Sequence, residues 1–199
     1  KFRGKGAFEK LSESFRWLKS QGYPYTISMC VTGFNVNEMP GVVEFAADMG
    51  AGNVHYMWYF VRGRGRQSGF APLEAIFENL VESSIRAEKL GISVDNIEAM
   101  KTQIFAPAGT IHDGGTAGWE SLAVGPDEKL YPSAALVGVE ELASDMGSGL
   151  VDAWRNSRVL ERIRNSTAVD GDSPLRFILG GGDIDHRYLY GGKFSGEDP

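Results

Sequence analysis

The sequence predicts an α/β fold built from parallel β/α units, and three observations support this prediction. Residues 8–18, 37–50 and 72–81 carry apolar side chains at the spacing of amphipathic helices. Residues 25–32 and 53–60 are short runs rich in β-branched or aromatic side chains, which is typical of strands. The two kinds of segment alternate along the chain, and strands that alternate with helices at this spacing usually pair in parallel.

Each of the three expected helices has one apolar face, which we expect to cover the sheet. In the first helix this face consists of Phe8, Leu11, Phe15 and Leu18. In the second helix, which ends at Gly50, it consists of Met39, Val42, Val43, Ala46 and Met49. In the third it consists of Leu73, Ile76, Phe77, Leu80 and Val81.

The ends of the two strands are the expected location of a binding site. Ligands of parallel α/β sheets bind beyond the C-terminal ends of the strands, which here are followed by residues 30–35 and 59–66. Tyr59 would lie at this C-terminal edge of the sheet. Cys30, the single cysteine, lies in a strand that we expect to be buried, and we interpret it as a packed thiol.

The second half of the sequence follows a different pattern. We expect one domain over residues 1–105 and a smaller, loop-rich one over residues 106–199. A β-hairpin is predicted at 120–132 around a Gly-Pro-Asp turn, and a helix at 150–164. The tail beyond residue 166 is expected to be mostly loop, and His112 and Asp113 in the glycine-rich segment before the hairpin are expected at the surface.

Composition excludes several classes of function. The net charge of -6 and the pI near 5.1 argue against nucleic-acid binding, which favours a basic surface. No apolar run approaches the length of about 18 residues that a membrane helix needs. A single cysteine excludes an internal disulfide framework and is compatible with a reducing cytoplasm, where we expect the protein to reside. The chain begins with Lys1, so we interpret it as a fragment.

Five segments, in order along the chain, resemble motifs of radical S-adenosylmethionine (SAM) enzymes with a SPASM-type C-terminal extension. They are RGKGAF at residues 3–8, SMCVTGFN at 28–35, GRG at 63–65, AVGPDEKLYP at 123–132 and DAWRNS at 152–157. The tail at residues 175–190 is similar to a peptide-modifying subgroup of these enzymes.

The resemblance implies a fold and a chemistry. The fold would be the C-terminal part of a radical SAM partial (β/α) barrel with parallel strands, followed by a small α+β SPASM-like extension. A Cys-x3-Cys-x2-Cys loop upstream of Lys1 would hold a [4Fe–4S] cluster that binds SAM, and a 5′-deoxyadenosyl radical would then modify a peptide substrate. An electron donor such as flavodoxin or ferredoxin is implied as a partner. The alternative is a non-catalytic α/β module that has lost its clusters and binds a peptide or protein.

By their place in the family motifs, four residues are candidates for contacts with SAM. They are Arg3, Ser28, Thr32 and Asn35. A hydroxyl or amide there could bond the ribose or the amino-acid end of SAM. The alternative interpretation is ordinary strand and turn chemistry, in which Asn35 simply supports the loop.

The SPASM-like extension departs from its family pattern. At the spacing of the last family cysteines stand Asp170, Ser173, Leu179 and Asp183, and Ser133 stands where the hairpin motif has its thiol. Neutral serine is a poor substitute for thiolate, and leucine cannot ligate iron. We therefore expect auxiliary clusters to be absent or held by other groups, which would leave a structural or peptide-binding module.

The segment from Gly180 to His186 gives a further hypothesis. Asp183, Asp185 and His186 could hold a metal ion, since histidine and carboxylates suit several ions, and this would make the protein a metal-dependent enzyme. The alternative that we favour is a glycine turn in which Asp183 or Asp185 caps nearby amides and His186 is hydrogen-bonded.

Overall fold

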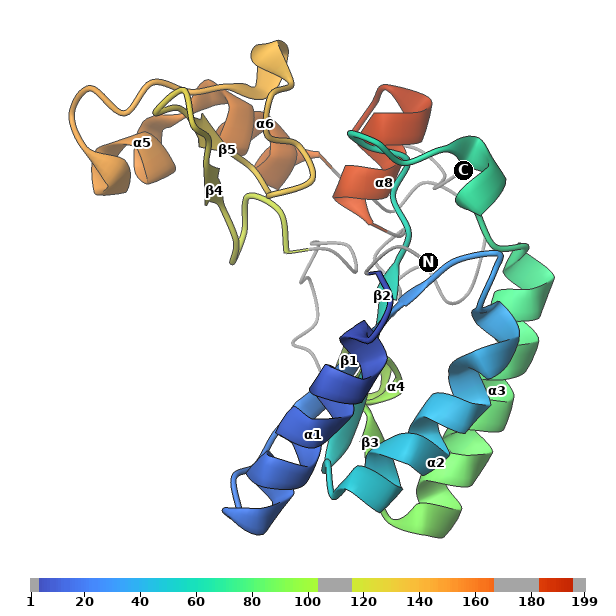
Figure 1. Cartoon of the computed structure of the whole chain (residues 1–199). Helices are drawn as coiled ribbons and strands as arrows, with labels where there is room; N and C mark the ends of the chain where they lie inside the picture. Colours follow the sequence, from blue (N-terminus) through green and yellow to red (C-terminus); the bar gives the residue numbers. More distant parts are fainter. Residues whose placement is uncertain (1–3, 104–115, 167–182, 195–199) are drawn as a thin grey trace. The chain divides into compact units, whose positions relative to one another are not determined.

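The computed structural model describes residues 4–103, 116–166 and 183–194, and it divides the chain into two compact units, Lys1–Lys101 and Thr102–Pro199 (Figure 1). The division lies a few residues before the domain boundary expected from the sequence. In these three described stretches, no helix has both the length and the apolar character needed to cross a membrane.

The first unit is a parallel α/β structure, which confirms the α/β fold class and the prediction of parallel β/α units. Its elements are α1 (Ala7–Ser20), β1 (Thr26–Val31), α2 (Met39–Met49), β2 (Asn53–Trp58), α3 (Leu73–Leu90), β3 (Ser93–Val94) and α4 (Asp95–Gln103). The strands form one sheet in the order β1-β2-β3, with both pairings parallel. The described residues form this three-stranded sheet and no barrel.

The sheet register is set by pairing along the whole of β1 and β2, from Thr26 opposite Asn53 to Val31 opposite Trp58. The short strand β3 pairs only with the start of β2. Past the end of β3, the side chain of Asn96 forms the backbone hydrogen bonds with β2 that a longer strand would form. Its Oδ1 accepts from the Tyr56 backbone N–H at 2.8 Å, and its Nδ2 donates to the Tyr56 carbonyl at 3.0 Å. This amide satisfies backbone groups that would otherwise lack a partner.

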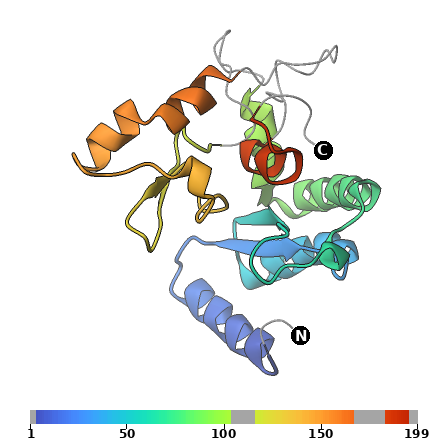
Figure 2. The same cartoon turned by 90° about the horizontal axis from the view of Figure 1, so that it is seen from above.

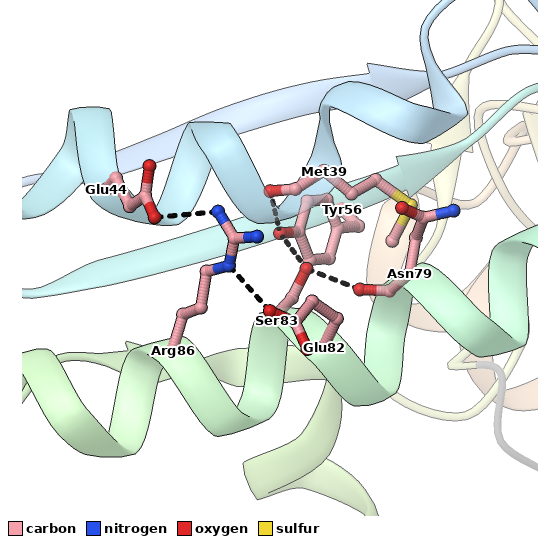
Figure 3. A network of polar contacts seen from close by, with 7 residues as sticks. All are labelled: Met39, Glu44, Tyr56, Asn79, Glu82, Ser83 and Arg86. Carbon is pink, nitrogen blue, oxygen red and sulfur yellow. Dashed lines mark hydrogen bonds and ion pairs between the residues drawn. The ribbon is translucent and has the colours of Figure 1, made fainter.

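A buried hydroxyl joins β2 to the helices α2 and α3, which pack side by side (Figures 1 and 3). The Tyr56 hydroxyl lies 2.8 Å from the Met39 carbonyl oxygen and 2.9 Å from Ser83 Oγ, and Ser83 Oγ donates to the Asn79 carbonyl at 2.6 Å. Burial raises the pKa of Tyr56. Nearer the surface, Arg86 joins the same helices through ion pairs with Glu44 and Glu82.

The helix α1 buries less than the sequence predicted. Phe8 is 63% exposed and Leu11 is 49% exposed, so the prediction that they pack against the sheet is wrong. The reason is that α1 packs against α2, where the Phe8 ring meets Phe45 at 5.5 Å. Phe15 is partly buried and stacks on Tyr25, so this end of the helix does join the core.

The helix α3 also presents part of its apolar surface to solvent. Ile76 and Leu80 pack into the core as expected, but Leu73, Phe77 and Val81 are exposed, which corrects the prediction for these three. Only a narrow face of the helix contacts the core. Phe77 and Val81 each follow a core residue by one position, which turns their side chains away from this face. Figure 2 shows α3 from above.

The second unit begins with the predicted hairpin, which is confirmed as the antiparallel pair β4 (Ala123–Val124) and β5 (Leu130–Tyr131). The expected helix at 150–164 is instead two helices, α5 (Leu150–Asn156) and α6 (Arg158–Asn165). The break is at Ser157, whose extended backbone lets its hydroxyl cap α6 by accepting from Leu160 N–H at 3.2 Å. The tail, expected to be mostly loop, contains the helix α8 (Ile184–Gly191), so that prediction is wrong for these residues.

Candidate functional site

One face of the parallel sheet is the candidate site in the first unit. Successive strand residues point to opposite faces, and register partners on neighbouring strands point the same way. Ile27, Val31, Val54 and Tyr56 are buried in the core and define one face. The other, which we call the exposed sheet face, carries Ser28, Cys30, His55 and Met57.

A histidine–aspartate pair crosses this face. His55 Nδ1 lies 2.8 Å from Asp95 Oδ1, and the two side chains are 41% and 40% exposed. Asp95 can reach the histidine because the chain passes from β3 directly into α4. A carboxylate on Nδ1 holds the imidazole in one orientation and leaves Nε2 for another partner. Ser28 is the register partner of His55 and forms no hydrogen bond within the described residues, so a free hydroxyl stands beside this pair.

The loop after β1 is held by a compact polar network. Asn35 Oδ1 accepts from Thr32 N–H at 2.7 Å and from the Thr32 hydroxyl at 2.9 Å. Asn35 Nδ2 donates to the Cys30 carbonyl at 3.0 Å. The side chains of Thr32 and Asn35 therefore shape the C-terminal end of β1, as the supporting role considered from the sequence requires.

The loop after β2 packs against the side chain of Tyr59. The Tyr59 hydroxyl accepts from Arg66 N–H at 2.7 Å and lies 3.2 Å from the Arg66 carbonyl oxygen. A Cβ atom on Gly65 or Gly69 would lie 3.0 Å from the Tyr59 side chain, which is closer than ordinary packing. Gly33 N–H donates to the Gly69 carbonyl at 2.9 Å, so the loops that follow β1 and β2 are joined.

The four candidate SAM residues have different positions. Ser28 lies on the exposed sheet face, and Thr32 and Asn35 lie together in the loop network. Arg3 lies outside the described residues. The interpretation of Cys30 as a packed thiol is wrong, because the residue is exposed. Its strand is buried on one face only, and the alternation of side chains places Cys30 on the other.

In the second unit the end of the hairpin meets α8. The Ser133 hydroxyl donates to Asp185 Oδ1 at 2.6 Å, and Ser133 is only 8% exposed. Burial, and to a smaller extent the charge of Asp183, raise the pKa of Asp185 to about 6, while the hydrogen bond from Ser133 opposes this shift. The structure thus joins Ser133 to the segment where the family places its last cysteine ligand.

The proposed metal ligands have other roles in the structure. Asp183 caps α8 by accepting from His186 N–H at 3.0 Å, and the His186 ring lies 4.4 Å from that of Tyr190. Across the described residues, no three His, Cys, Asp or Glu side chains gather closely enough to hold a metal ion. The capping interpretation is confirmed for Asp183. Asp170, Ser173 and Leu179, together with His112 and Asp113, lie outside the described residues.

The His55–Asp95 pair was not found from the sequence. The pair is separated by 40 residues, and no motif marks it. A partial signal was present, since alternation along β2 places His55 opposite the apolar Val54 and Tyr56. The contact of Asp95 with the sheet depends on how α4 is placed, which no local pattern indicates.

Comparison with known proteins adds no assignment: no family model matches this sequence, and no curated protein matches it either.

Proposed function

We propose that this chain is part of a radical SAM enzyme that modifies a peptide. The observation that carries the proposal is the exposed sheet face, where the Ser28 hydroxyl, which forms no hydrogen bond within the described residues, lies beside the His55–Asp95 pair. The neighbouring Thr32–Asn35 network follows the C-terminal end of β1, where ligands of parallel sheets bind. Of the five motifs that resemble the family, SMCVTGFN at residues 28–35 begins at Ser28 and continues into the loop after β1.

The residues of this chain fit one of the two groups that such chemistry needs. SAM offers ribose hydroxyls and an amino-acid end, which a serine hydroxyl can bind. A [4Fe–4S] cluster needs three or four thiolates, and this chain has one cysteine, so its ligands would come from a preceding segment. When bound, the cluster would supply the electron that cleaves SAM, received from a donor such as flavodoxin or ferredoxin.

In this proposal the residues of the chain bind and orient. Ser28 would hold SAM on the exposed sheet face, and the Thr32–Asn35 network would keep the neighbouring loop in shape. The His55–Asp95 pair would present a fixed imidazole Nε2 to the bound molecules. The second unit, in which Ser133 and Asp183 stand at positions of family cysteines, would serve as a structural or peptide-binding module.

The alternative is a non-catalytic peptide- or protein-binding module. The single cysteine favours it, because neither unit can assemble a cluster from its own thiolates. The two functions differ in what the full-length protein contains: the enzyme needs iron and binds SAM, and the binding module needs neither.

Iron and sulfide analysis of the full-length protein, prepared without oxygen, separates the two. The enzyme predicts about four irons per chain from one cluster. A full-length protein without iron after reconstitution would refute the enzyme and leave the binding module.

SAM binding by calorimetry tests the site itself. Ser28→Ala should weaken SAM binding about tenfold, while Thr26→Val, two residues earlier on the same sheet face, should leave it within about twofold. Equal affinities for both variants and the unsubstituted protein would show that SAM does not bind at Ser28.

A further inference from the structure

The loop after β2 is unusually basic for this acidic protein. Arg62, Arg64 and Arg66 are all exposed, and residues 53–72 contain no aspartate or glutamate. The chain as a whole carries a net charge of -6. The loop of residues 62–66, which we call the arginine loop, is therefore a local concentration of positive charge.

Hydrogen bonds within the chain hold the backbone of the arginine loop without a ligand. Arg66 is held through both of its backbone polar groups by the Tyr59 hydroxyl, and Gly65 N–H donates to the Arg62 carbonyl at 2.8 Å. Gly65 packs so closely against Tyr59 that a side chain would not fit. A backbone held in this way loses little conformational entropy on binding, which favours affinity.

Two of its guanidinium groups are available. Arg64 and Arg66 form no ion pair within the described residues. By contrast, Arg86 is paired with Glu82 on its own helix and with Glu44 on α2. A guanidinium group presents paired N–H donors that match the two oxygens of a carboxylate. Arg64 and Arg66 therefore offer two guanidinium groups for carboxylates, two residues apart in sequence.

The position of the loop is that of a ligand site. It follows the C-terminal end of β2 and is joined to the loop after β1 through the Gly33–Gly69 hydrogen bond. Ligands of parallel sheets bind at this end of the strands. Nucleic acid is a poor candidate, because the acidic chain would repel a long polyanion.

We propose that the arginine loop binds carboxylates of an acidic segment in the peptide substrate, with Arg64 and Arg66 as the contacting residues. The peptide as substrate rests on the proposed function, while the recognition of carboxylates rests on the loop itself. Because the arginines are exposed, salt should weaken the binding.

The test is fluorescence anisotropy of a fluorescein-labelled, glutamate-rich peptide with the 199-residue chain at low salt. The double variant Arg64→Gln and Arg66→Gln should bind about tenfold more weakly. The matched control is Arg16→Gln with Arg158→Gln, which removes the same charge from two exposed sites elsewhere and should stay within about twofold. Circular dichroism of each variant checks that it is folded.

Three results would overturn the proposal: no binding by the unsubstituted chain, equal losses for both double variants, or tighter binding of a labelled oligothymidine than of the peptide. Since this assay needs neither iron nor SAM, it is independent of the test of the proposed function. An iron-free full-length protein that binds the peptide through these arginines would refute only the radical chemistry. A full-length protein that contains iron but does not bind the peptide would refute only the proposal that the arginine loop binds carboxylates.

Discussion

The Ser133 hydroxyl donates a hydrogen bond of 2.6 Å to Asp185 Oδ1, across 52 residues of sequence. Ser133 lies two residues after β5 and Asp185 lies in the first turn of α8, so the contact joins the end of the hairpin to this helix. The carboxyl group is largely withdrawn from water, and burial is the main reason why its pKa is raised to about 6. From this pair we expect the stability of the second unit to depend on pH.

We predict that the second unit loses stability as the pH rises from about 4 to about 6. In this window the folded chain keeps a proton on Asp185 that the unfolded chain has lost, because the unfolded pKa is about 4. The free energy of unfolding should fall by roughly 2–3 kcal/mol across the window. Urea unfolding followed by tryptophan fluorescence measures it.

Asp185→Asn should abolish most of this dependence, because the amide does not titrate. The matched control is Asp145→Asn, a substitution of an exposed aspartate in the same unit, which should keep the slope of the unsubstituted chain. A slope of the same size in Asp185→Asn would contradict the assignment to this carboxyl group.

Tyr56→Phe should destabilise the first unit by about 1–2 kcal/mol, since it removes a buried hydroxyl that lies within bonding distance of Met39 and Ser83. Tyr23→Phe makes the same chemical change at a residue that is 56% exposed, and it should change stability by less than about 0.5 kcal/mol. Chemical denaturation gives both values. Equal effects of the two substitutions would show that the network contributes nothing.

Two glycines in the first unit should respond to alanine with opposite signs. A Cβ on Gly33 would lie 2.6 Å from the Phe70 carbonyl oxygen, so Gly33→Ala should cost about 1–3 kcal/mol. Gly41 lies inside α2 with open space around it, and Gly41→Ala should stabilise by about 0.5–1 kcal/mol. Thermal unfolding of both variants measures the difference, and stabilisation by Gly33→Ala would show that the loops are not tightly joined there.

Cys30 should react with a thiol reagent such as DTNB in the folded protein, because the residue is exposed. We expect one thiol to be modified without denaturant, at a rate within about tenfold of that in the unfolded chain. The rate of colour development measures this. Modification only after denaturation would restore the interpretation of Cys30 as a packed thiol.

Local patterns in the sequence placed most of the elements. The periods of apolar residues located α1, α2, α3 and the strands β1 and β2, and the Gly-Pro-Asp turn located the hairpin. These features depend on neighbours within a few residues, so the sequence itself contains the signal. The failures concern α8, which was expected as loop, and the continuous helix at 150–164, which Ser157 divides.

The burial of individual side chains depended on packing instead. Periodicity placed Phe8, Phe77 and Cys30 on apolar faces or in a strand, yet each is exposed, because a helix or strand buries only the part of its surface that another element covers.

The candidate site was determined in two ways. The sequence alone selected Arg3, Ser28, Thr32 and Asn35 through their place in motifs that resemble a family, and it placed residues 59–66 beyond the C-terminal end of a strand. Only the tertiary structure joined His55 to Asp95 and Ser133 to Asp185, and it alone decided that Thr32 and Asn35 bond to each other while Ser28 stays free. The physical reason is that contacts between distant residues depend on how whole elements pack, which no local pattern encodes.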